Sequence, residues 1–134
     1  MKSGTKCELL LRKALWRAGI RYRLHGRGLP GRPDLVFGSK RLVVFCDGDF
    51  WHGRDLEARL AKLANGHNAP YWMSKIRRNV ERDHDQMLEL NRAGWAVLRI
   101  WEGDILRDVD GQVMLVARTL NERGNARAAA ELGA

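Results

Sequence analysis

Apolar side chains recur along this chain first with helical and then with strand spacing, and the change of spacing predicts the order of its elements. A helix is expected near the start, because residues 5–8 (TKCE) have the spacing of a capping box. It should end near Gly19. Residues 20–24 follow as a short strand, and residues 26–33 are rich in turn formers. The apolar face of the first helix consists of Leu9, Leu11, Leu15 and Trp16.

Two apolar runs with strand composition then predict a β-hairpin. They cover residues 34–37 and 41–46, and Gly38 and Ser39 between them indicate a short turn. The second run is apolar on both faces, which is typical of a strand in the middle of a covered sheet.

The second half of the chain alternates helix and strand again. The order helix, hairpin, helix, strand, helix predicts an α/β fold in which helices cover a mixed sheet. We expect one domain over residues 1–134, with a core at 5–122. In order, the later elements are an irregular stretch at 53–70 with a helical turn near 56–63, a helix at 70–91 ended by Gly94, a strand at 95–101, a helix at 112–122 and a frayed end at 123–134.

The net charge of the chain indicates what kind of partner it binds. The formal net charge is +8 and the pI is near 10.2, which favours a polyanion such as DNA, although basic charge can also serve solubility alone. Cys7 and Cys46 lack metal-ligand spacing and are expected to be reduced thiols of a cytoplasmic protein. No membrane span or signal peptide is expected either.

Acidic residues near the hairpin are the first candidates for chemistry. Asp34 opens an apolar strand, so it is either a turn residue or a metal ligand at the rim of the sheet. Residues 46–53 leave the next strand with two carboxylates, two aromatic rings and His52. Such a group can hold Mg²⁺ through oxygens, with His52 as a general base, although His52 can equally cap a turn.

The helix at 70–91 carries a carboxylate on its apolar side. Asp83 shares the stripe of Trp72, Ile76, Val80, Met87 and Leu90. A carboxylate facing a core needs a partner, and a nearby imidazolium or a backbone turn would serve. The opposite face is suited to phosphate contacts and consists of Lys75, Arg77, Arg78 and Arg82. Glu8, as the last residue of the capping box, needs no function at all.

Four blocks in order, LPGRPDLVF, VVFCDGDFWH, YWMSKIRRNVERD and GWAVLRIWE, resemble the very short patch repair (Vsr) endonucleases over roughly residues 5 to 105. The resemblance implies a restriction-endonuclease-like PD-(D/E)XK fold and magnesium-dependent nicking of one DNA strand beside a T:G mismatch. It also implies a double-stranded DNA partner, work beside a cytosine methylase or repair machinery, and a monomer.

The resemblance assigns roles to residues of this chain. Asp34 and the backbone carbonyl of Cys46 correspond to metal ligands. His52 corresponds to the group that acts on the water, Asp83 supports it, and Glu8 joins the catalytic set. The resemblance also implies that Phe50, Trp51 and Trp72 are aromatic wedges that enter the DNA. The expected DNA contacts are completed by Arg32 and by the phosphate-facing residues Lys75, Arg77, Arg78 and Arg82.

Three departures from the family pattern matter. The structural zinc ligands are replaced by Asp49, Arg54, Leu56 and Gly103, so no zinc is expected. Asp47 replaces a histidine beside the metal and offers a carboxylate that can bind it directly. The basic arm of the family has no counterpart in the four residues before Thr5. Two alternatives therefore stay open: a restriction, defence or mobile-element nuclease without mismatch specificity, and a catalytically inactive DNA-binding module.

Overall fold

The computed structural model describes residues 6–24, 26–48, 58, 61 and 69–133. These residues form an α/β arrangement in which helices flank one four-stranded sheet, which confirms the predicted fold class. In chain order the elements are α1 (Lys6–Arg17), β1 (Arg23–Leu24), β2 (Leu35–Phe37), η1 (Gly38–Lys40), β3 (Leu42–Asp47), α3 (Ala69–Arg92), β4 (Ala96–Trp101), α4 (Glu102–Arg107) and α5 (Val109–Gly133).

The sheet is mixed and runs in the order β1-β2-β3-β4. β2 and β3 are antiparallel, with Leu35 opposite Val44, whereas β3 and β4 are parallel, with Cys46 opposite Ile100. β3 lies between two neighbours and all six of its residues are buried, as its apolar pattern predicted.

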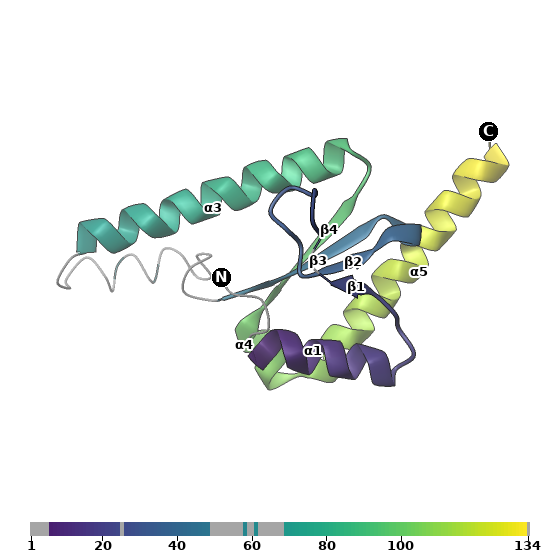
Figure 1. Cartoon of the computed structure of the whole chain (residues 1–134), viewed down its shortest axis with the longest axis horizontal. Helices are drawn as coiled ribbons and strands as arrows, with labels where there is room; N and C mark the ends of the chain where they lie inside the picture. The colour runs from purple at the N-terminus through teal and green to yellow at the C-terminus, as the bar shows by residue number, and fades with distance from the viewer. Residues whose placement is uncertain (1–5, 25, 49–57, 59–60, 62–68, 134) are drawn as a thin grey trace.

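Two layers of helices cover the two faces of the sheet (Figure 1). On one face α1, α4 and α5 pack against a core of alternate strand residues that includes Leu35, Val44 and Cys46. On the other face α3 places Leu90 against Val43 and Phe45. Figure 1 also shows the first half of α3 extending beyond the edge of the sheet. The helix has 24 residues, about 36 Å of length, which is more than this sheet needs for cover.

The connection between β2 and β3 is longer than the predicted two-residue turn. A 3-10 turn occupies Gly38–Lys40, and Arg41 then adopts a left-handed conformation with φ 53°. Arg123 of α5 explains why this turn is stable, because its guanidinium donates to the carbonyls of Lys40 and Gly94, each at 3.0 Å. The prediction of a hairpin is confirmed, and the prediction of its turn is wrong.

The C-terminal part contains more helix than predicted. α4 is too short to show a helical period in the sequence, and α5 starts at Val109 because its core-facing positions begin before Gln112. α5 continues to Gly133 through an alanine-rich segment with high helix propensity, where the sequence had predicted no helix beyond residue 122. None of the described helices has the length and apolar character to cross a membrane.

Candidate active site

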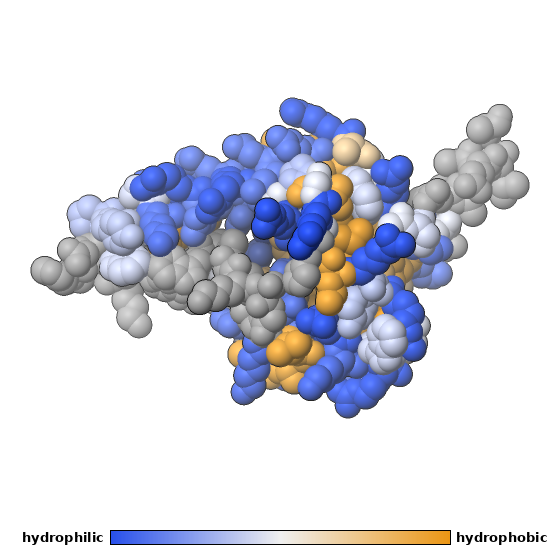
Figure 2. Space-filling model, in the orientation of Figure 1, coloured by the Kyte–Doolittle hydropathy of each residue, from blue (hydrophilic) through white to orange (hydrophobic). Residues whose placement is uncertain are grey.

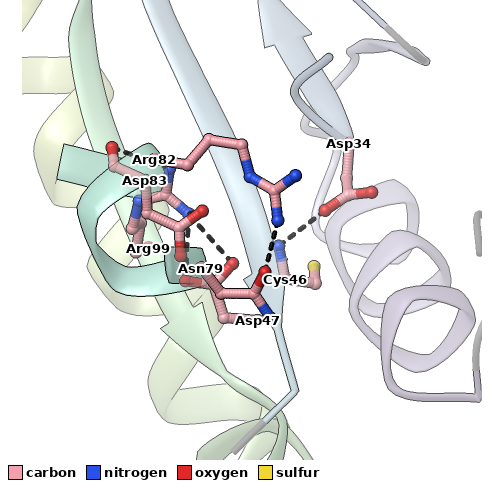
Figure 3. Close-up of polar contacts among 7 residues, drawn as sticks. All are labelled: Asp34, Cys46, Asp47, Asn79, Arg82, Asp83 and Arg99. Atoms are coloured by element: carbon pink, nitrogen blue, oxygen red, sulfur yellow. Dashed lines mark hydrogen bonds and ion pairs between the residues drawn. The ribbon is translucent and has the colours of Figure 1, made fainter. Parts of the chain in front are cut away.

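Asp34 stands at the first residue before β2, where the chain turns sharply into the sheet. Gly31 and Arg32 both have positive φ, 77° and 49°, and the buried ring of Pro33 follows them. Glycine suits this conformation because it lacks a Cβ. The turn aims the Asp34 carboxylate at the neighbouring strand, where its Oδ2 accepts a hydrogen bond of 2.7 Å from the backbone N–H of Cys46 (Figure 3). Asp34 therefore follows a turn and places its carboxylate at the rim of the sheet, a position that is compatible with both alternatives from the sequence, turn residue and metal ligand.

Glu8 lies in the first turn of α1 and is only 1% exposed, which a simple capping role does not require. It is hydrogen-bonded to Asp34, and Arg12 donates to its Oε2 at 3.4 Å. A hydrogen bond between two carboxyl groups requires a proton on one of them. Burial raises the pKa of Asp34 to about 7, helped by that hydrogen bond and by the charges of Glu8 and Asp47, against the opposing effect of the Cys46 N–H.

This raised pKa predicts how stability depends on pH without metal. Between about pH 4 and pH 7 an unfolded Asp34 loses its proton while the folded one keeps it, so rising pH removes stability through this group. Asparagine at position 34 cannot ionise, so the Asp34→Asn variant does not lose this stability as pH rises. As pH rises to 7, we expect the free energy of unfolding of the variant to rise relative to that of wild type by on the order of 2 kcal/mol. The melting temperature of the variant should rise relative to wild type in the same direction.

Thermal melting in chelator across this pH range measures the difference. Asp85→Asn is the matched control, because it removes an exposed carboxylate of α3. Its difference from wild type should change little with pH. A constant difference for Asp34→Asn over the whole range would contradict the raised pKa.

A second group of charges lies on the α3 side of β3. Arg99 of β4 places Nη1 3.1 Å from both carboxylate oxygens of Asp47 and 3.7 Å from Oδ1 of Asp83. Its Nη2 donates to the backbone carbonyl of Asp83 at 3.4 Å. Asp83 therefore has a cationic partner, as its place on an apolar helix face demanded, and among the described residues that partner is a guanidinium instead of the expected imidazolium.

Asp34 and the second group of charges line one hollow of about 240 Å³ between the sheet and α3. Three arginines and three aspartates contribute to its lining, and Figure 3 shows Asp34 on one side of Cys46 with Asp47, Asp83 and Arg99 on the other. Such a lining can bind an anionic group and a cation side by side. The lining residues are Gly31, Arg32, Asp34, Phe45, Asp47, Arg82, Asp83, Gln86 and Arg99.

The predicted phosphate-facing residues lie next to this hollow. Lys75, Arg77, Arg78 and Arg82 are all exposed on α3, and Figure 2 shows the hydrophilic surface along that helix. A groove of about 500 Å³ runs along it, lined by Tyr71, Lys75, Arg78, Asn79 and Arg82. Trp72 is half-buried and meets the ring of exposed Tyr71 edge-on, with centroids 4.9 Å apart.

Several predicted site residues lie outside the described part of the chain. These are Phe50, Trp51 and His52, together with Asp49, Arg54 and Leu56 at replaced zinc-ligand positions. Within the described ranges, no three His, Cys, Asp or Glu side chains gather as a metal cluster. Cys7 and Cys46 are buried thiols that form no disulfide with each other. Burial raises the pKa of the Cys46 thiol, which leaves the backbone carbonyl as the ligand that Cys46 can offer.

Arg99 is the site residue that sequence reasoning missed. The signal was present, because Arg99 is the one charged residue within an apolar run from Trp95 to Trp101. A cation on a strand that faces a packed helix needs an anionic partner, for the same reason that drew attention to Asp83.

Comparison with known proteins gives consistent matches. Residues 1–58 match the family model described as DNA mismatch endonuclease Vsr. The chain is similar to Type II nicking enzyme V.NmeDIP of Neisseria meningitidis serogroup C, with 44% identity over 78% of this chain and 70% of that protein. It is 38% identical to Type II nicking enzyme V.HpaIIP of Haemophilus parainfluenzae over 90% and 84% of the two chains. DNA mismatch endonuclease Vsr of Escherichia coli strain K12 is 38% identical over 73% and 61%.

Proposed function

This chain belongs to the Vsr family of DNA nicking endonucleases, and we propose from that premise that it cuts one strand of double-stranded DNA beside a T:G mismatch, using magnesium. Membership confirms the resemblance that its motifs indicated and makes the chain a DNA endonuclease. The metal, the mismatch and the role of each residue are the proposed parts.

The observation that carries the magnesium proposal is the pair formed by half-buried Asp34 and buried Glu8. The contact between the two carboxyl groups and the raised pKa of Asp34 mean that this pair keeps a proton below neutral pH, and a cation bound there would replace it. Magnesium commonly takes only one or two protein carboxylates and completes its shell with water and substrate phosphate. A small acidic pair, of which Asp34 lines the hollow, therefore fits magnesium better than a metal that needs a full protein ligand set.

Asp34 and the carbonyl of Cys46 are the residues proposed to hold the metal, with Glu8 behind them. A bound magnesium ion would supply positive charge to the scissile phosphate. The hydrogen bond from the Cys46 N–H fixes Asp34 at the strand edge, so no reorganisation is needed when DNA arrives. His52 is proposed as the general base, and Asp83 as the residue that supports it. For the protein as a whole, the absence of a structural zinc, a monomeric state and a methylase partner stay predictions from the sequence.

DNA is proposed to lie along the groove of α3 and across the hollow. The exposed Lys75, Arg78 and Arg82 line or flank that groove and offer contacts to phosphates, while Arg32 stands at the rim beside Asp34. Phe50, Trp51 and Trp72 are the proposed wedges that read a weak base step.

A nicking assay on matched T:A and mismatched T:G duplexes tests the proposed substrate. With magnesium present, we expect the T:G duplex to be nicked at least about tenfold faster, because a mismatched step costs less to unstack around an inserted ring. Chelator should stop both reactions.

The alternative of a nuclease without mismatch specificity is kept because similar proteins are named Type II nicking enzymes. Equal rates on T:G and T:A duplexes would support that alternative and reject the mismatch. Undiminished nicking in chelator would reject magnesium, and the two results are independent of each other.

A further inference from the structure

Arg99 joins the two strands and the helix that meet at the hollow. It lies on β4 directly across from Phe45 of β3 in the parallel register. Because side chains alternate along a strand, Phe45 and Asp47 share one face of β3, the face that α3 covers. The Arg99 guanidinium stacks on the Phe45 ring, with its central carbon 4.1 Å from the ring centroid. Stacking fixes the plane of the guanidinium before it meets any carboxylate.

The fixed guanidinium contacts carboxylates on two different elements. Nη1 is 3.1 Å from both oxygens of Asp47 at the end of β3 and 3.7 Å from Oδ1 of Asp83 on α3. Nη2 adds a bond of 3.4 Å to the Asp83 carbonyl. The side chains of Arg99, Asp47 and Asp83 are only 18%, 3% and 15% exposed, so their charges interact through little water.

We propose that Arg99 is a positioning residue of the nicking reaction, which ties Asp47 to Asp83 and holds Asp83 on the wall of the hollow opposite Asp34. Asp47 then serves as a counter-ion of Arg99 and not as a metal ligand. The inference rests on the proposed role of Asp83 in catalysis.

Charge balance explains why the guanidinium is needed. Asp47 and Asp83 approach the same nitrogen of Arg99, so without it two carboxylates of like charge would repel each other. Asp83 is the less buried of the two and lies on a helix face, so its side chain has more room to change its rotamer than that of Asp47. A buried ion pair adds little net stability when compared with apolar packing, and its clearer use is to specify geometry.

Arg99→Met tests this role at a temperature well below the melting temperatures of all variants. The methionine keeps most of the packing on Phe45 and removes the charge. We expect kcat for nicking to fall on the order of 10- to 100-fold, as for a misplaced catalytic group, with KM for DNA within about threefold of wild type. Adding Asp47→Asn should recover about fivefold of the lost kcat, because it removes the repulsion on Asp83.

Arg107→Met is the matched control, because Arg107 forms an exposed pair with Asp104 at 3.1 Å on α4. It should leave kcat unchanged. If the methionine variant does not fold, Arg99→Lys is used in its place. The single ammonium of lysine cannot reproduce the contacts of a planar guanidinium with both Asp47 and Asp83, so kcat of this variant should fall about three- to tenfold.

Three results would overturn the proposal. An unchanged kcat in Arg99→Met or Arg99→Lys would show that positioning does not need the guanidinium. A raised KM with unchanged kcat would make Arg99 a DNA contact. Failure of Asp47→Asn to restore any kcat would disprove the counter-ion role. A wild-type protein that nicks no duplex would instead reject the proposed function, so the two failures are distinct.

Discussion

Replacing Asp34 by asparagine is expected to reduce magnesium-dependent nicking by at least about 10³-fold, which corresponds to about 4 kcal/mol of lost transition-state stabilisation. The amide keeps the size of the side chain, and its oxygen can still accept the hydrogen bond from the Cys46 N–H. What it loses is the negative charge that would hold the metal. The rate of single-turnover nicking on a T:G duplex measures the loss.

The same variant separates a catalytic role from a structural one. Because Asp34 is a half-buried acid with a raised pKa, removing its charge should keep or increase the melting temperature near neutral pH. Asp110→Asn, an exposed carboxylate at the start of α5, is the control and should keep full activity. Nicking at the wild-type rate by Asp34→Asn would remove Asp34 from the active site. Loss of activity together with a lower melting temperature would indicate a structural role.

Much of the fold could be predicted because its signals are periodic. The apolar run at β3 and the stripe on α3 each repeat over enough residues to indicate burial on one or both faces. α4 could not be predicted, since its six residues contain less than two helical turns. The turn at Gly38–Lys40 depends on Arg123, which lies 83 positions after Lys40, and no local pattern contains that contact.

The candidate site could be predicted to different degrees for different residues. Asp83 was identified because a carboxylate on an apolar helix face needs a partner, and in the structure Arg99 is such a partner. Glu8 could not be separated from a helix cap by sequence physics, because its burial beside Asp34 depends on how α1 packs on the sheet. Family resemblance supplied that assignment.

Replacing Asp83 by asparagine is the second large effect that we expect. Turnover should fall about 10²-fold, in the range that a supported general base contributes, while DNA affinity stays nearly the same. The two quantities separate because different residues serve them. Asp83 lies in the hollow beside Arg99, whereas the exposed cations of α3 face outward along the groove. Binding to phosphates depends on those cations and not on a carboxylate.

Single-turnover kinetics with a binding titration on the same duplex measure both quantities. Glu81→Gln is the matched control, since it removes an exposed carboxylate of the same helix, two residues away. It should change neither quantity greatly. An equal loss of turnover and affinity in Asp83→Asn would mean that Asp83 shapes the DNA-binding surface through Arg99, because neutralising it releases one contact of that guanidinium. Loss of turnover alone would mean that the charge of Asp83 acts in the chemical step. The contact with Arg99 would then serve to position a carboxylate that the reaction needs.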